Sequence, residues 1–140
     1  MRRIWTGSSE YAVTNDYLNY GDIYMPSKTN VINGIESQYP IMTKRFKQIQ
    51  REQYDLFCHK QHDYGSLNIS VGTRLETEDE VKLSLLGIWF RMNDKIMRAK
   101  NLLMRSDAPA VEGEPLEDAF LDLSNYGIMA TMVKEGVWGK

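Results

Sequence analysis

The sequence has little of several features that define protein classes. Cys58 is its single cysteine, which excludes an intrachain disulfide and a zinc site built from several thiolates, and which fits a reducing compartment. No apolar run approaches the length of a membrane span, and the two arginines near the start precede no apolar signal stretch. The formal net charge is only −2, so any phosphate site must be local. We therefore expect a cytoplasmic protein with no membrane partner and no direct nucleic-acid binding.

The chain is long enough for one folded domain. Its 140 residues, 42% of them apolar and 26% charged, can bury about 68–70% of the unfolded surface. Residues 1–39 are rich in Tyr, Asn, Gly and Ser, lack a sustained helical period and contain turn signals such as Asn33-Gly34. We predict an irregular N-terminal arm over 1–39, with room for a short hairpin, and a helical domain over 40–140.

Three helices are predicted after the arm. The first covers about 41–62, the second runs from a capping box at Thr77–Glu80 to about 104, and the third runs from Pro115 to Glu135 before Gly136. Three helices predict an all-α bundle. The second helix is expected to bury Leu85, Ile88, Trp89, Met92, Ile96 and Leu103. Three helices leave several apolar residues near the end of the chain without cover, which favours a homo-oligomer (a dimer or a tetramer). These residues are Met129, Met132, Val133, Val137 and Trp138.

The third helix combines an apolar sequence with acidic side chains. In "EPLEDAFLDLSNYGIM" (114–129), Asp118, Asp122 and Asn125 are spaced i, i+4 and i+7 and therefore share one helix face. A carboxylate in such surroundings is costly unless it is paired, hydrogen-bonded or metal-bound. Oxygen ligands on one face suit a hard cation such as Mg²⁺. The alternative is a polar network that Arg or Lys satisfies.

Two further charged helix faces accompany these acids. Glu52 and Asp55 on the first helix could face the third-helix acids across a shared site, although taken alone they are explained by a solvated charged face. On the second helix, charged residues follow one side: Arg91, Asp94, Lys95 and Arg98. These cations either bind phosphate or pair with acids of neighbouring helices, and they could alternate between the two.

Three sequence blocks within about 43–138 are informative together: "KQHDYGS", "GIWFRMNDKIMRAKNLL" and "EPLEDAFLDLSNYGIMATMVKEGVW". In combination they resemble the phage and prophage family called the nucleotide-modification-associated domain. More distantly, the chain is similar to the MazG-like all-α nucleoside triphosphate pyrophosphohydrolases. Those enzymes bind Mg²⁺ through Glu-x-x-Glu and Glu-x-x-Asp helices, whereas this chain has Glu52-x-x-Asp55 and, four residues apart, Asp118 and Asp122.

The resemblance implies an enzyme that splits an NTP or dNTP into NMP and pyrophosphate in the nucleotide pool of a phage-infected host cytoplasm. Its implied Mg²⁺ or Mn²⁺ ligands and catalytic residues are Glu52, Asp55, Asp118 and Asp122. Its implied substrate-binding residues are Lys60, Asp63, Tyr64, Arg91, Asp94, Lys95, Arg98, Asn125 and Tyr126. The alternative is a non-catalytic phage module that binds or sequesters a nucleotide or a nucleotide-derived signal. A purely structural bundle is a third hypothesis, which leaves the buried acids unexplained.

Overall fold

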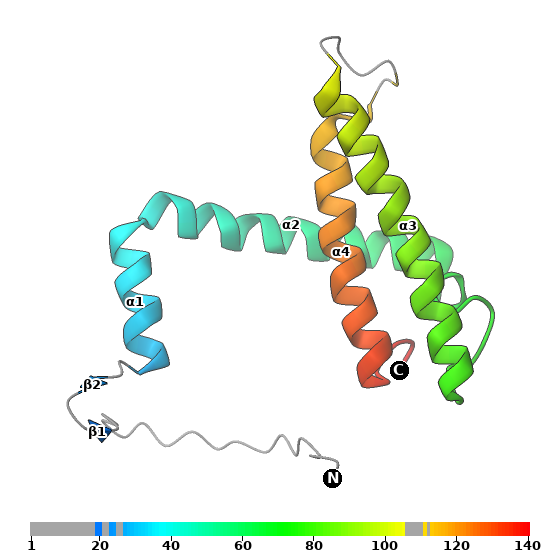
Figure 1. Ribbon diagram of the computed structural model, residues 1–140, viewed down its shortest axis with the longest axis horizontal. Coiled ribbons are helices and arrows are strands. Elements are labelled where there is room, and N and C mark those ends of the chain that lie inside the picture. The colour runs from blue at the N-terminus through cyan, green and yellow to red at the C-terminus, as the bar shows by residue number, and fades with distance from the viewer. Residues whose placement is uncertain (1–18, 21–22, 25–26, 106–110, 112) are drawn as a thin grey trace. The chain divides into compact units, whose positions relative to one another are not determined.

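A computed structural model describes residues 19–20, 23–24, 27–105, 111 and 113–140 of the chain. The protein is all-α, as predicted. The described helices, shown in Figure 1, are α1 (Lys28–Gln38), α2 (Pro40–Tyr64), α3 (Glu78–Met104) and α4 (Leu116–Glu135). The short 3₁₀ helix η1 (Ser66–Asn68) follows α2, and two two-residue strands, β1 (Asn19–Tyr20) and β2 (Ile23–Tyr24), pair antiparallel.

The chain divides into two compact units, residues 1–47 and 48–140, so that α2 begins in the first unit and ends in the second. In the first unit, the prediction of an irregular arm is wrong for residues 28–38, which form α1. The side chain of Ser27 caps this helix by accepting a hydrogen bond from the Asn30 backbone N–H at 3.2 Å. The Asn33-Gly34 pair, a turn signal by composition, lies inside the helix. Residues 1–18 of the predicted arm lie outside the described residues.

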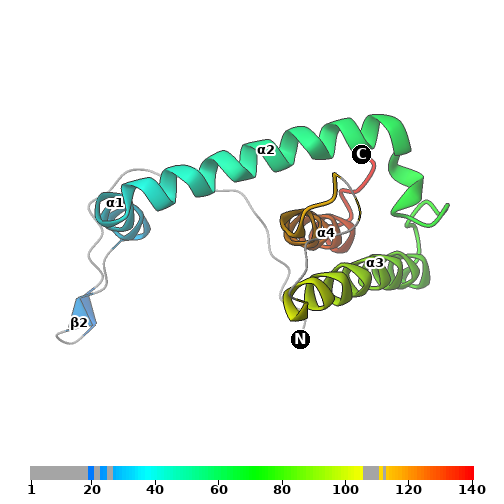
Figure 2. The same ribbon diagram turned by 90° about the horizontal axis from the view of Figure 1, so that it is seen from above.

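The second unit contains an antiparallel pair formed by α3 and α4, which lie side by side in Figures 1 and 2. The helix α3 begins at the predicted capping box, because the Thr77 hydroxyl accepts a hydrogen bond from the Glu80 N–H at 3.2 Å and the Glu80 carboxylate accepts one from the Thr77 N–H at 3.3 Å. The helix α4 ends at Gly136, whose φ of 74° is a left-handed conformation that glycine adopts without strain.

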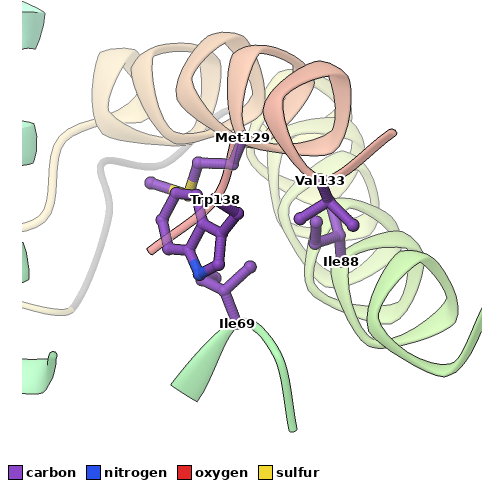
Figure 3. Packing of buried hydrophobic residues seen from close by; sticks show 5 residues of the cluster. All are labelled: Ile69, Ile88, Met129, Val133 and Trp138. Atoms are coloured by element: carbon purple, nitrogen blue, oxygen red, sulfur yellow. The ribbon is translucent and has the colours of Figure 1, made fainter. Parts of the chain in front are cut away.

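The core of this unit joins both helices of the pair to the segments that flank them. Figure 3 shows Trp138 between Met129 and Ile69, and Val133 beside Ile88. The Trp138 indole N–H donates a hydrogen bond to the Ser66 carbonyl at 2.9 Å and thereby ties the end of the chain to η1. Met129, Val133 and Trp138 are therefore buried within one chain, and these three residues give no reason to expect a second subunit.

The predicted buried stripe of α3 is only half correct. Leu85, Ile88 and Met92 belong to the core or pack against it. Trp89, Ile96 and Leu103 are 54%, 50% and 63% exposed, because α4 is the one described helix that packs along α3 and it covers a single face. None of the helices in the described part of the chain is long and apolar enough to cross a membrane.

Candidate functional site

A cavity of about 520 Å³ lies within the second unit, where the end of α2, the segment around η1 and the middle of α3 and α4 meet. This volume is in the range of about 300–1,000 Å³ that is typical of small-molecule sites. Its lining residues are Phe57, Lys60, Gln61, Tyr64, Asn68, Ile69, Arg91, Lys95, Asp122, Asn125, Tyr126 and Met129. The cavity therefore brings together a large part of the predicted site from segments that are distant in the sequence.

Helical spacing explains why these side chains point to one place. Lys60 and Tyr64 are four residues apart on α2, and Arg91 and Lys95 are four residues apart on α3, so each pair shares one face of its helix. Asp122 and its neighbours one turn later present their side chains from α4. Each helix thus contributes one turn of polar side chains to a common wall.

Asp122 is held by two lysines. The Lys95 ammonium lies 2.7 Å from Asp122 Oδ2, and the Lys60 ammonium lies 3.2 Å from Asp122 Oδ1. The Asp122 side chain is 16% exposed, whereas those of Lys95 and Lys60 are 31% and 44% exposed. The partner that a carboxylate in so apolar a helix requires is therefore a pair of ammonium groups.

The electrostatics of this triad favour its charged form. Burial is the largest single influence on the Asp122 pKa and acts to raise it, but hydrogen bonds from Lys95 and Lys60 together with their positive charges leave the pKa below its ordinary value. The hydrogen bond with Asp122 raises the pKa of Lys95, against the opposing effect of desolvation. Asp122 is therefore a carboxylate, and Lys95 an ammonium, across the physiological pH range.

The two arginines that the sequence placed along this side of α3 have different environments. Arg91 lines the cavity and donates one hydrogen bond, from Nη2 to the Asn68 carbonyl at 3.0 Å. Its other N–H groups have no hydrogen bond to the described residues. Arg98 lies two turns further on, contacts the Glu114 carbonyl and the Pro115 carbonyl (3.4 Å for the latter), and does not line the cavity. Arg91 is thus available to a ligand, whereas Arg98 holds the start of α4.

Aromatic rings and amides complete the cavity wall. Tyr64 is 67% exposed, Tyr126 is half-buried, and Asn125 is buried with 8% of its surface accessible. The Asn68 Oδ1 atom is buried without a hydrogen-bond partner among the described residues. Sequence reasoning missed Asn68, because it lies in η1, where no helical period marks a lining position.

The predicted metal ligands do not form one group with each other. Glu52 and Asp55 are exposed on α2, and the half-buried Asp118 does not line the cavity. In the part of the chain that the structure describes, no three His, Cys, Asp or Glu side chains lie together in a way that could hold a metal ion. Both oxygens of Asp122 contact lysines. In this arrangement the four acids do not fit the Mg²⁺ or Mn²⁺ site that the resemblance implies.

Two other predicted substrate contacts also lie away from the cavity lining. Asp63 is exposed and sits 3.1 Å from the His62 ring nitrogen, and Asp94 is exposed on α3. The cavity wall therefore contains three cations, from Lys60, Arg91 and Lys95, and a single carboxylate. This local excess of positive charge belongs to a chain whose formal net charge is −2.

Comparisons of the chain with protein-family models, with curated proteins and with solved structures found no match. The chemistry of the cavity is therefore the basis for assigning a function.

Proposed function

We propose that the cavity binds a nucleotide and that the protein is a nucleotide-binding or nucleotide-sequestering module. The observation that carries this proposal is the meeting of three cations with two tyrosine rings around one cavity of about 520 Å³. Phosphate requires positive charge and hydrogen-bond donors, and a base requires a flat apolar surface. The cavity wall offers both.

The cations provide two kinds of phosphate contact. Lys60 and Lys95 act as point charges with several donors each, and Arg91 presents a planar fork that matches two phosphate oxygens. In the ligand-free cavity Asp122 already satisfies both lysines. A phosphate group carries more negative charge than a carboxylate, so it can draw the lysines from Asp122 as it enters. Asp122 thus keeps the lysines in place and competes with the ligand.

The aromatic and amide side chains suit the nucleoside part of the ligand. Tyr64 and Tyr126 are the rings on which a base can stack, a contact worth about 1–3 kcal/mol per base in single-stranded nucleic-acid sites. The buried Asn125 amide can donate to and accept from the base edge or the sugar. Which base binds best depends on how it stacks on these rings and which hydrogen bonds it makes with the Asn125 amide.

A titration of the full chain with each NTP and dNTP tests the proposal, in buffer with Mg²⁺ and separately in buffer with EDTA. We expect micromolar binding that survives EDTA and that weakens about tenfold in Lys95→Gln, because a charge-assisted contact is lost. Lys82→Gln is the matched control, since Lys82 is an exposed lysine of the same helix outside the cavity. Absence of binding for every nucleotide, or equal losses in both variants, would refute the assignment.

The metal-dependent pyrophosphohydrolase that the resemblance implies is a second proposal for the same cavity. Its support is that Asp122 lies beside cations that could face a triphosphate. A metal ion would have to take Asp122 from both lysines, and Glu52, Asp55 and Asp118 would have to approach it. Pyrophosphate release from an NTP with Mg²⁺ or Mn²⁺, lost in Asp122→Asn, is the result that favours the hydrolase. A phage setting and a host-cytoplasm location remain predictions from the resemblance.

A further inference from the structure

The face of α3 that points away from α4 is apolar and exposed. We call five of its residues the outer stripe: Leu83, Leu86, Phe90, Met97 and Met104, which are 46%, 55%, 60%, 45% and 80% exposed. Beside it runs a flanking row of Trp89, Ile96 and Leu103. The rings of Trp89 and Phe90 pack edge to face with their centroids 5.0 Å apart. This surface therefore continues along most of the helix.

The spacing of the outer stripe matches a helix-to-helix seam. Leu83, Phe90, Met97 and Met104 recur every seven residues, which places them on one line of the helix. Ser84, Ile88 and Ala99 are buried on the other side of α3. A helix with apolar residues on both faces is normally covered on both, and among the described helices only α4 packs along α3.

We propose that the outer stripe binds the outer stripe of a second copy of this chain in an antiparallel homodimer. The eight apolar side chains of the stripe and the flanking row are about half exposed. Trp89 and Phe90 each offer on the order of 200 Å², and the six aliphatic side chains offer less, so together they can bury several hundred Å² per copy. That area approaches the roughly 800 Å² that a protein–protein interface of standard size buries on each partner.

The charges near the ends of α3 favour the antiparallel orientation. Its first turn contains Glu78, Asp79 and Glu80, whereas its last turn contains no charged residue of either sign and is flanked by Lys100 before it and by Arg105 after it. An antiparallel pair places the acidic end of one helix beside the basic end of the other, whereas a parallel pair places like charges together. The opposed helix dipoles favour the same orientation.

The flanking row gives the partner a place to dock. An apolar groove of about 330 Å³ lies between α3 and α4, lined by Ile96, Ala99, Lys100, Leu103, Met104, Phe120 and Leu123. The groove is near the C-terminal end of α3, so in an antiparallel pair it faces the N-terminal part of the second α3, where the stripe has two leucines, Leu83 and Leu86. The middle of the interface then falls close to Phe90 and Asn93.

Sedimentation equilibrium of the full chain from about 1 to 100 μM tests the dimer. We expect a reversible monomer–dimer equilibrium that Phe90→Glu and Met97→Glu each weaken at least about a hundredfold, since each buries two unpaired charges per dimer. Ile128→Glu is the control, because Ile128 is a comparably exposed residue of α4 (55%) outside the stripe and the groove. Circular dichroism checks that each variant stays helical. A monomer at every concentration would overturn the proposal, as would stripe variants that dimerise as well as the control.

Cysteine cross-linking tests the orientation in a Cys58→Ser background. In an antiparallel dimer, Asn93→Cys lies near the two-fold axis and forms a disulfide between identical chains, whereas Met104→Cys lies far from its equivalent. In a parallel dimer both would cross-link. Equal cross-linking by Met104→Cys would therefore contradict the antiparallel arrangement.

Discussion

The two faces of α3 differ in the kind of side chain that they leave without a partner of the opposite charge or without apolar cover. The inner face packs Ile88 into the core and directs Arg91 and Lys95 into a polar cavity, where the single carboxylate present is held between two lysines. The outer face exposes large apolar side chains such as Leu86 and Phe90. An excess of cations in a cavity and an apolar seam in water are both costly to a chain alone. This difference is the basis of the two proposals, an anionic ligand for the inner face and a second copy of the chain for the outer face.

The largest expected difference in stability is between two substitutions that are two residues apart in the sequence but lie on opposite faces of α3. Ile88→Ala should lower the free energy of unfolding by about 3 kcal/mol, because Ile88 is 2% exposed and its removal leaves a cavity. Leu86→Ala should lower it by no more than about 0.5 kcal/mol when the protein is dilute enough to be monomeric, because Leu86 is 55% exposed. Urea denaturation at low protein concentration measures both. Similar losses for the two variants would show that α3 has no free outer face.

A smaller effect concerns the charge balance of the inner face. Asp122→Asn should lower the free energy of unfolding by about 1 kcal/mol at neutral pH, a modest value because Lys60 and Lys95 are 44% and 31% exposed. The Asp122 pKa is lowered in the folded chain, so its stabilisation is fully present above the unfolded Asp pKa of about 4 and is lost as the pH falls through the lower folded value. The Lys95 pKa is raised, so its contribution is full below the unfolded Lys pKa and is lost as the pH rises through the folded value.

Urea denaturation of the wild type and of Asp122→Asn across pH therefore shows whether Asp122 is paired with lysines or is an ordinary surface charge. The stability difference between the wild type and Asp122→Asn should be constant near neutrality and should shrink at the acid and alkaline ends. A difference that grows as the pH falls below 4 would contradict the lysine pairing of Asp122.

The smallest effect on the free energy of unfolding is expected at Asn68, which lines the cavity. Its Oδ1 atom has no hydrogen-bond partner among the described residues, so Asn68→Ala removes no such bond and should change the free energy of unfolding by less than about 0.5 kcal/mol. Ser84→Ala is the comparison, because the Ser84 hydroxyl donates to the Ile69 carbonyl at 2.7 Å and its loss leaves that buried group unpaired, at a cost of about 1–2 kcal/mol. In thermal unfolding, the midpoint temperature of Ser84→Ala should be well below that of Asn68→Ala.

Local signals predicted the helices of the second unit well. The capping box at Thr77–Glu80 and the glycine at 136 act through backbone groups next to them in the chain, so their effect can be read from a few residues. The helix α1 was missed because Asn33 and Gly34 are typical of turns. The signals that could have found it are the Ser27 cap and the apolar residues Val31 and Ile35, which are four residues apart on one helix face.

The partners of the site residues could not be read in the same way. Helical spacing shows that Lys60, Lys95 and Asp122 each lie on a polar helix face, but which turn of one helix meets which turn of another depends on how the core packs. The shift of one turn between Lys95 and Arg98 decides which of them reaches Asp122 and which binds the carbonyls before α4. Asn68 lies in a loop that carries no period at all.

The central claim is that the cavity is built for phosphate and that Asp122 competes with it. Titration of the best-binding nucleotide into the wild type and into Asp122→Asn, both in EDTA, tests this directly. Asp122→Asn removes the competing carboxylate and frees both lysines, so we predict binding about tenfold tighter than in the wild type. Weaker or abolished nucleotide binding in Asp122→Asn would contradict the account.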